Sequence, residues 1–491
     1  MNLAMLLEMV AQAEPDRVAV SSGGSNFTYA ELFDRARRYA TALEGRDVSA
    51  VCYLGVNSPE AVALMFGASL AGLPYAPLNY RWTAAQLAEA VGRIAPVAIL
   101  ADEDCEARVP DVPGVARVDL TGAREGGVPV DPDGEAPAVL LFTSGTSGTP
   151  KAALLRNRHL VPYVLETVGF VNAEPDEAIL VSVPPYHIAA ISSVLTSVYA
   201  GRRMVQLAAF EPSDWVRVAR EERVTQAMVV PTMLNRILDC LEEDGQGLPA
   251  LRHLSYGGGR MPAAVVERAM RLLPELDLVN AYGLTETSST ITLLSPDDHR
   301  EAAGSEDPAV RARLGSVGRA LPSIEIEVRD DDGNAVPAGS PGEIWVRGDQ
   351  VSGEYLSHRT IESSGWFPTR DHGYLDADGF LYLHGRADDV IVRGGENLSP
   401  AEIEDRLAEH DGVAEAAVVG VPDLEWGERV EAFVVLAPGA HVQTAELQTW
   451  VRETLRSTRV PAEIHYVDEL PYNETGKLLR RELRARLATG S

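Results

Sequence analysis

The sequence predicts an α/β protein with a large N-terminal domain of stacked β-α layers, a small barrel-like β layer, and a small α+β C-terminal domain. Helical patterns alternate with short apolar runs in the first part of the chain, whereas from about Leu314 short strands are separated by turn residues. Near Gly385–Gly395 the chain becomes charged and glycine-rich, and a new amphipathic helix follows. Since 491 residues exceed one ordinary core, we expect a large domain over residues 1–387 and a small one over residues 388–491.

The alternating pattern of the N-terminal part predicts largely parallel sheets covered by helices. The runs are strand-like at Ala50–Asn57 and Glu177–Pro184 and helix-like at Ala30–Gly45 and Ser58–Gly72. Ser58 precedes a proline and a glutamate, an order typical of a helix N-cap. A second set of such units follows after about Ala200, with strand-to-loop edges at Gln226–Met233 and Leu276–Gly283.

The sequence pattern after about Leu314 predicts two β-rich layers. Ser323–Asp330 and Gly342–Gly348 are short alternating strands separated by a turn-rich stretch, which indicates a small antiparallel or barrel-like layer. Strand-like runs at Ala414–Val421 and Arg429–Leu436, followed by a basic terminal helix, form the predicted C-terminal domain.

Composition excludes several classes of partner. The net charge of −29 argues against nucleic acid or an anionic membrane surface, because both require a basic face. Any anionic ligand must then be held by locally placed donors. The three cysteines are far apart and form no metal or redox spacing, which favours a reduced, cytoplasmic setting. The N-terminal stretch is amphipathic without a basic start, and no run predicts a membrane span.

The stretch TSGTSGTPK, Thr143–Lys151, directly follows the apolar run Ala138–Phe142. A strand followed by a loop of Gly, Ser and Thr offers backbone N–H groups and hydroxyls to an anion, and a terminal lysine adds a compact charge. The stretch does not match GxxxxGK[ST], because Pro150 precedes the lysine and Ala152 follows it. A flexible polar loop and an ATP-sensing or ATPase phosphate loop are the alternative interpretations.

Lysine is rare in this chain. Of the 43 basic residues only Lys151 and Lys477 are lysines, and all the others are arginines. Arginine is a broad planar fork, whereas lysine is a compact point charge on a flexible stem. The two positions are therefore candidates for sites where an ammonium must reach a single oxygen.

Four motifs, in this order along the chain, resemble those of the adenylate-forming (ANL) superfamily. Within it the chain is most similar to the acyl- and aryl-CoA synthetase branch, of the chlorobenzoate–CoA ligase type. The four motifs are the loop Thr143–Lys151, YGLTET at Tyr282–Thr287, the block Gly365–Glu404, and NETGKLLRRELR at Asn473–Arg484. The resemblance covers nearly the whole chain. It implies an enzyme that joins a carboxylic acid to ATP as an acyl-adenylate, releases pyrophosphate, and passes the acyl group to a thiol. ATP, Mg²⁺ and CoA are the implied cofactors.

The resemblance also assigns roles to residues of the adenylation step. The β- and γ-phosphates go to Thr143, Ser144, Gly145, Thr146, Ser147, Gly148, Thr149 and Lys151. Thr285 would contact the α-phosphate, and Glu286 would bind Mg²⁺, since a hard cation prefers carboxylate oxygen. Lys477 would bridge the carboxylate and the α-phosphate and stabilise the transition-state charge.

The nucleoside is assigned to a second group of residues. Tyr282 would stack on adenine beside the backbone of Gly257, Gly258 and Gly259, and Asp371 would accept the ribose hydroxyls with support from Arg386. The family usually has a glycine before that aspartate, where this chain has Arg370. As plain structural alternatives, Tyr282 is a core tyrosine and Asp371 a turn residue.

The resemblance assigns the transfer of the acyl group to the thiol to the C-terminal domain. It also implies that this domain moves between the two reactions. Asp388 matches the hinge, Gly394 and Gly395 the pantetheine face, and Arg81 and Trp426 positions that approach CoA in relatives. The run Arg459–Ala462 lacks the second basic residue that usually grips CoA phosphates. CoA is the leading acceptor and a separate carrier-protein thiol the alternative. A homodimer is left open.

The acid pocket is expected around the segment Pro184–Ser193. His187 matches an aromatic or histidine gate, although a lone histidine is often structural. The segment carries no aspartate to pair with a substrate ammonium, which disfavours amino acids. The expected walls are small residues: Ala189, Ala190, Gly257, Gly258, Gly259, Ala281 and Gly283. Because small walls leave volume, a bulky apolar acid, aryl or alicyclic, is the predicted substrate.

Overall fold

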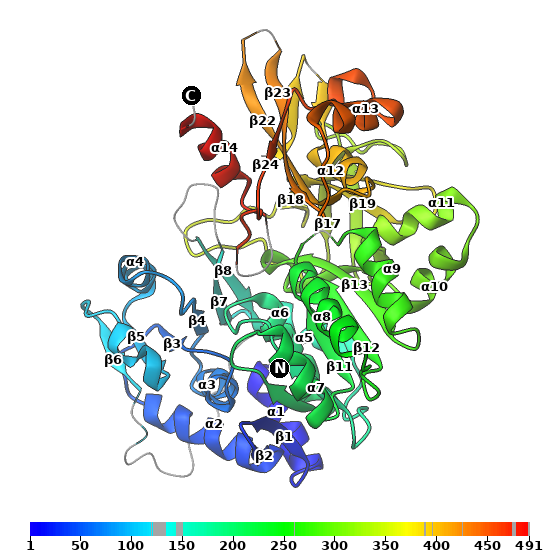
Figure 1. The fold of residues 1–491 in the computed structure, drawn as a ribbon. Helices are drawn as coiled ribbons and strands as arrows, with labels where there is room; N and C mark the ends of the chain where they lie inside the picture. The colour runs from blue at the N-terminus through cyan, green and yellow to red at the C-terminus, as the bar shows by residue number, and fades with distance from the viewer. Residues whose placement is uncertain are drawn as a thin grey trace.

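The computed structural model describes residues 1–118, 120, 134–143, 151–259, 261–386, 389–394, 396–424, 426–473 and 478–489. They form an α/β fold with two large sheets, a small antiparallel sheet and a C-terminal α+β unit, as the sequence predicts. Figure 1 shows the large sheets and their helices, blue to green, below the C-terminal strands and helices, orange to red. The boundary predicted near residue 388 stays a prediction. Among the described helices, none is both long and apolar enough to cross a bilayer.

The larger sheet has nine strands in the order β15-β14-β13-β12-β11-β9-β10-β1-β2. Their bounds are β1 (Val18–Ser22), β2 (Ser25–Thr28), β9 (Ala178–Val181), β10 (Arg203–Gln206), β11 (Gln226–Val229), β12 (His253–Gly257), β13 (Asp277–Leu284), β14 (Ser289–Leu294) and β15 (Arg319–Ala320). Its central pairs are parallel, as the β-α alternation predicts. Helices α7 (Pro212–Glu221), α8 (Pro231–Asp244) and α9 (Ala263–Leu272) share one core with this sheet.

The second sheet has six strands in the order β6-β5-β3-β4-β7-β8. Their bounds are β3 (Ala50–Leu54), β4 (Tyr75–Leu78), β5 (Val97–Ala101), β6 (Val115–Arg117), β7 (Pro137–Thr143) and β8 (Lys151–Arg156). Helix α4 (Ala84–Ile94) packs with its strands in a separate core. The strand pairs from β6 to β7 are parallel, and β7 and β8 form an antiparallel pair around the predicted phosphate loop.

The main core contains side chains from both large sheets and from the helices α1 (Leu3–Ala13), α2 (Tyr29–Leu43), α3 (Pro59–Leu70), α5 (Asn157–Thr167) and α6 (Ile188–Ala200). Every side chain from Ala61 to Leu70 in α3 is buried, because this helix is apolar on all faces. Ser58 caps it, accepting the Ala61 N–H at 3.2 Å, as predicted. A Cβ on Gly67 would lie 2.6 Å from Tyr39 Cβ, so glycine allows α2 to approach α3 closely.

The assignment of strands to the two large sheets does not follow their order along the chain. The run Glu177–Pro184, which contains β9, is predicted in the first set of units, and the residues of β1 and β2 are not among the predicted strands. In the structure β1 pairs in parallel with β10, and β9 lies between β10 and β11. The N-terminal strands therefore extend the sheet of the second set, because their apolar faces complete the core between the two sheets.

The remaining chain forms the two predicted β-rich layers. An antiparallel sheet contains β16 (Glu325–Arg329), β17 (Gly342–Arg347), β18 (Phe367–Leu375) and β19 (Leu381–Arg386). The C-terminal sheet contains β20 (Ile391–Arg393), β21 (Glu396–Leu398), β22 (Val413–Asp423), β23 (Gly427–Leu436) and β24 (Glu463–Tyr466). Its helices are α12 (Pro400–Ala408), α13 (Thr444–Thr454) and the terminal α14 (Arg480–Thr489). The helices α10 (Pro296–Gly304) and α11 (Pro308–Arg311) link β14 to β15.

Candidate active site

Several predicted site residues lie at the carboxyl ends of parallel strands in the nine-stranded sheet. His187 lies after β9, Gly257–Gly259 end and follow β12, and Tyr282–Glu286 end and follow β13. Strands β12 and β13 are parallel, with Gly257 beside Ala281. Because parallel strands end at one edge of a sheet, these segments are brought to the same edge, where α/β proteins commonly bind ligands.

Residues 352–356 join this edge to β8, the strand that begins at Lys151. The Leu154 N–H of β8 donates to the Glu354 carbonyl at 2.8 Å, and the Leu356 N–H donates to the Ala152 carbonyl at 3.0 Å. The Arg156 guanidinium binds the Glu354 carboxylate through Nε at 2.9 Å and Nη2 at 2.6 Å. The segment is thus fixed against the strand that begins with Lys151.

The same segment holds Glu286. The N–H groups of Ser352 and Gly353 donate to the Glu286 carbonyl at 2.8 and 3.1 Å, and the Tyr355 hydroxyl donates to its carboxylate Oε1 at 2.5 Å. The Lys151 Nζ lies 5.9 Å from the Tyr355 ring centroid, within cation–π range. Burial, followed by the Glu286 charge, raises the pKa of the Tyr355 phenol well above its ordinary value, so the phenol stays a donor. Tyr355 therefore connects the predicted phosphate-binding lysine with the predicted magnesium-binding glutamate.

The turn that carries Thr285 and Glu286 has an unusual backbone. The two residues lie in a short 3-10 turn after β13, and the next residues, Ser288 and Ser289, have φ angles of 57° and 119°. Such angles are costly for residues other than glycine and persist only where the surroundings impose them. Here the Gln350 amide donates to the Thr287 and Thr290 carbonyls at 3.0 and 2.7 Å.

Asp371 is the centre of a buried polar group. It is 7% exposed and accepts hydrogen bonds from Arg386 Nη1 at 2.9 Å and the Tyr282 hydroxyl at 2.6 Å. Burial lowers the pKa of Arg386, but Asp371 and also Glu286 act in the opposite direction, and the net pKa is raised. Arg386 is therefore electrostatically coupled to Glu286 as well as to Asp371. The predicted ribose residues are brought together, and Tyr282 joins them; whether Tyr282 also stacks on adenine stays a prediction.

The structure explains why the family places a glycine before this aspartate. Arg370 has a φ of 61°, in the left-handed region that only glycine adopts readily. The chain keeps that backbone conformation with arginine, at a cost of roughly 1–2 kcal/mol. With arginine at position 370, Asp371 still lies within hydrogen-bond distance of Arg386 and Tyr282.

Two of the glycines predicted to line the acid pocket are required by the sheet itself. A Cβ on Gly257 would lie 2.2 Å from the Ala281 carbonyl oxygen, and one on Gly283 would lie 1.8 Å from the Ser289 carbonyl oxygen. Close strand packing therefore requires glycine at positions 257 and 283, and their small size gives no information about the volume of the acid pocket. Gly258 and Gly259 are exposed, and a Cβ on Gly258 would meet only Val230.

The His187 segment is surrounded by aromatic rings. The His187 ring lies 4.6 Å from that of Tyr186, which packs edge-on against Tyr80 at 5.7 Å. The Arg81 guanidinium lies over Tyr80 at 5.5 Å. Arg81 and His187, far apart in sequence, are thus connected through one aromatic pair. Next to them, Ala189 is partly exposed and Ala190 is buried.

In the C-terminal unit, two of the residues predicted to face CoA lie together. The Gly394 N–H donates to the Trp426 carbonyl at 2.7 Å, and a Cβ on Gly394 would lie 3.1 Å from the indole ring. Arg459, the basic residue of the run expected to grip CoA phosphates, instead binds Glu402 and Glu396 at 2.5 and 2.8 Å. Its charge is already compensated within the C-terminal unit.

Several of the predicted site residues lie outside the described part of the chain, and two residues that contact the site were not predicted from the sequence. Outside the described residues lie Ser144, Gly145, Thr146, Ser147, Gly148, Thr149, Asp388, Gly395 and Lys477. Thr143 is described, and its hydroxyl donates to the Lys151 carbonyl at 3.4 Å. Tyr355 and Gln350 were not predicted, because neither belongs to a motif and their contacts arise only when residues 350–356 fold against β8 and the Glu286 turn.

Comparison with known proteins shows the family. Residues 7–356 match the AMP-binding enzyme family and residues 402–477 match the AMP-binding enzyme C-terminal domain. A fatty acid–[acyl-carrier-protein] ligase from Streptomyces coeruleorubidus is 31% identical, covering 97% of this chain and 94% of the relative. A feruloyl-CoA synthase from Amycolatopsis sp. is 33% identical, covering 97% of each.

The fold is also that of a solved enzyme. The structure of o-succinylbenzoate CoA synthetase from Bacillus subtilis, in complex with the acyl-adenylate intermediate OSB-AMP, superimposes with a TM-score of 0.84. The two chains are 30% identical, and 98% of this chain and 97% of that chain are covered. The protein therefore belongs to the AMP-binding enzyme family, in the acyl-CoA synthetase branch of the adenylate-forming superfamily, and is an ATP-dependent, AMP-forming ligase.

Proposed function

We propose that the protein activates a bulky apolar carboxylic acid, aryl, alicyclic or similar, as an acyl-adenylate and transfers the acyl group to CoA. The observation that carries the adenylation half is the contact chain from Lys151 through Tyr355 to Glu286, with Arg386 and Asp371 electrostatically coupled to it. These groups supply a phosphate-facing ammonium, a carboxylate for a hard cation and an acceptor for ribose hydroxyls in one place.

The residues present fit Mg²⁺. Glu286 offers a carboxylate whose Oε1 is held by the Tyr355 hydroxyl, which leaves Oε2 for a cation. When bound, Mg²⁺ neutralises phosphate charge. Thr285 would orient the α-phosphate, the loop from Thr143 to Lys151 would hold the outer phosphates, and Asp371 would orient the ribose.

The two acidic reactants must then approach one another. Lys477 would bridge the substrate carboxylate and the α-phosphate and stabilise the charge of the transition state, a preorganised electrostatic contribution. The C-terminal domain would then turn at Asp388 and present Gly394 and Gly395 to the incoming thiol. The glycines suit that role because a missing side chain lets a pantetheine arm pass close to the backbone.

The proposed acid class depends on the alanines and the aromatic group. Ala189, Ala190 and Ala281 limit the pocket less than larger side chains would, and Tyr186 and His187 offer ring faces to an apolar acid. A cavity of about 20 Å³ lies behind Ala190, between α3 and α6, lined also by Met65.

CoA is the proposed acceptor, and a carrier-protein thiol is the second candidate. Relatives of both kinds cover almost the whole chain. The contact between Gly394 and Trp426 supports a pantetheine path common to both acceptors. The engagement of Arg459 by two glutamates favours the carrier protein, because that arginine is the basic residue left to meet CoA phosphates in its run.

A panel of carboxylic acids, assayed for AMP release with CoA and separately with a phosphopantetheinylated carrier protein, tests both assignments. We expect AMP release to require a thiol acceptor and to be faster with benzoate-sized and larger apolar acids than with acetate. Preference for acetate would contradict the acid class. AMP release and thioester formation with the carrier protein but not with CoA would contradict the acceptor.

Tyr355 offers a test of the contact chain itself. Tyr355→Phe keeps the ring beneath Lys151 and removes only the hydrogen bond to Glu286. We expect the Mg²⁺ concentration needed for half-maximal adenylation to rise by about threefold to tenfold, since a hydrogen bond to a charged group contributes roughly 1.5–3 kcal/mol and part is recovered from water. A fall in kcat with an unchanged Mg²⁺ requirement would indicate a merely structural role. Tyr374→Phe, on β18, is the matched control.

A further inference from the structure

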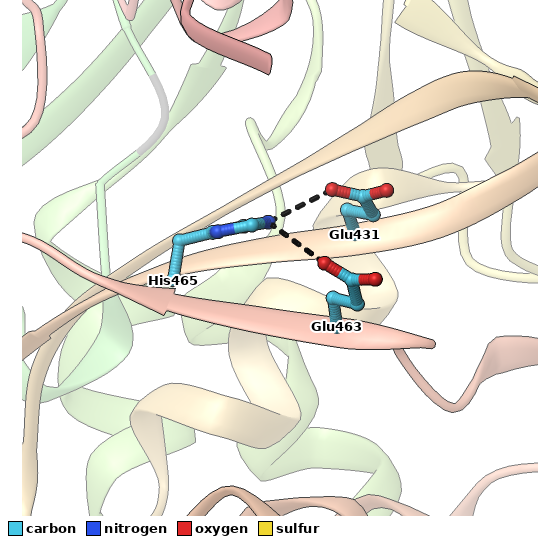
Figure 2. A group of neighbouring side chains, drawn as sticks. All are labelled: Glu431, Glu463 and His465. Carbon is cyan, nitrogen blue, oxygen red and sulfur yellow. Dashed lines mark hydrogen bonds and ion pairs between the residues drawn. The ribbon is translucent and has the colours of Figure 1, made fainter. Parts of the chain in front are cut away.

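A side-chain cluster in the C-terminal sheet lies outside the site described above. Figure 2 shows Glu431 on β23 and Glu463 and His465 on β24, with their polar ends directed toward one another. Glu431 Oε2 lies 2.8 Å from His465 Nε2, which lies 3.9 Å from Glu463 Oε2. The three potential ligand atoms are all within 4.8 Å of one another. Across the part of the chain that the structure describes, this is the only such group of three metal-ligating side chains.

Strand register places two negative charges opposite one another. Strands β23 and β24 are parallel, with Glu431 beside Glu463 and Phe433 beside His465. Side chains two residues apart lie on the same face of a sheet, so all three ligands face one side. Like charges directly opposite each other destabilise a strand pair. A cation between them removes that repulsion.

The deepest ligand is already oriented. Glu431 is 1% exposed, and Arg429 donates to its Oε1 from Nε at 2.7 Å and Nη2 at 2.6 Å, which leaves Oε2 directed at His465. The Phe433 ring stacks on the imidazole at 4.9 Å and fixes its plane. Outer contacts of this kind orient metal ligands in proteins. Arg429 offsets one carboxylate charge, and the second remains for a bound cation.

We propose that Glu431, Glu463 and His465 bind a zinc ion. An imidazole nitrogen with two carboxylate oxygens is a donor set that Zn²⁺ accepts, at roughly 2.0–2.2 Å from each atom, whereas Mg²⁺ and Ca²⁺ prefer oxygen alone. Zinc binds the lone pair of an imidazole nitrogen, so Nε2 carries no proton in the bound state. Three protein ligands leave the fourth position to water, and the exposed Glu463 and partly exposed His465 provide the path of entry.

The ion would fasten the outer strand of the C-terminal sheet. Strand β24 is the last strand before Asn473–Arg484, the segment that carries Lys477. Phe433, on the same face as the cluster, packs with Leu470 and with Leu483 of α14. Zinc would therefore stabilise the layer on which the terminal helix lies, independently of the proposed adenylation chemistry.

Equilibrium dialysis of the metal-stripped full-length protein against Zn²⁺ tests this proposal. We expect one Zn²⁺ per chain, at least about tenfold weaker binding for Glu463→Gln and for His465→Gln, and no binding at this site for the double variant. Zn²⁺ should also raise the unfolding temperature of the wild type and not that of the double variant.

A matched control is available in the same unit. The His410 Nε2 lies 3.4 Å from Glu446, and its Nδ1 accepts the Gly412 N–H at 3.1 Å. Since this histidine–glutamate pair lies outside the cluster, His410→Gln should leave zinc binding unchanged. Absence of stoichiometric binding to the wild type, or full binding to the double variant, would overturn the proposal. Since Glu463 is exposed, its variant keeps the fold and decides the question even if the His465 variant does not.

Discussion

Replacing Lys477 with alanine should slow acid-dependent ATP–pyrophosphate exchange by about 10²-fold or more. The variant removes the ammonium that would bridge two acidic reactants, and loss of one preorganised donor at a developing charge has an effect of this size. Substrate binding is expected to change much less, because the interaction strengthens in the transition state. The measurement is the exchange rate at saturating acid and ATP.

Two controls separate this role from a general loss of structure. Lys477→Arg keeps the positive charge but replaces a compact ammonium with a planar fork, and we expect it to remain strongly impaired. Thioester formation from a supplied acyl-adenylate should survive in Lys477→Ala, because the bridging step is then already complete. Near-normal exchange by Lys477→Ala would refute the assignment.

Glu286→Gln should lower adenylation by about 10²-fold as well, and the loss should depend on magnesium. Glutamine keeps an oxygen that accepts from the Tyr355 hydroxyl, so the local fold is retained. It removes the negative charge that a hard cation prefers. We expect the rate of adenylation at low Mg²⁺ to fall most and to recover partly as the Mg²⁺ concentration is raised, measured by pyrophosphate release.

The matched control is an exposed carboxylate of the loop between β17 and β18. Glu362→Gln should leave both the rate and the Mg²⁺ requirement unchanged, because the Glu362 carboxylate is exposed and accepts a hydrogen bond from the Ser364 hydroxyl, an interaction that glutamine can keep. Equal impairment of the two variants would attribute the effect to net charge and would contradict a specific role for Glu286.

Local sequence patterns predicted the elements but not their assembly. The cap at Ser58 and the helix that follows it are local properties, and the structure confirms both. The placement of β1 beside β10 joins residues about 180 positions apart, and no local period encodes such a pairing. The site follows the same division, since Asp371 and Glu286 stand in motifs whereas Tyr355 reaches Glu286 only through the folded segment on β8.

Two residues show why a motif needs its structure. Arg370 interrupts the family pattern, yet its φ of 61° lies in the left-handed region that glycine adopts most readily. Gly283 matches the pattern, yet the Ser289 carbonyl excludes any side chain there whatever the substrate. The arginine at position 370 is therefore no argument against the assigned role of Asp371. The glycine at position 283 gives little information about the size of the acid.

The central claim is that this protein adenylates a carboxylic acid. It is tested most directly by isotope exchange between labelled pyrophosphate and ATP. The wild-type protein is assayed with and without a bulky apolar acid. We predict exchange only when the acid and Mg²⁺ are present, with AMP accumulating once a thiol acceptor is added. Acid-independent release of orthophosphate and ADP, with no exchange, would show a phosphate-loop ATPase instead and would contradict the proposed chemistry.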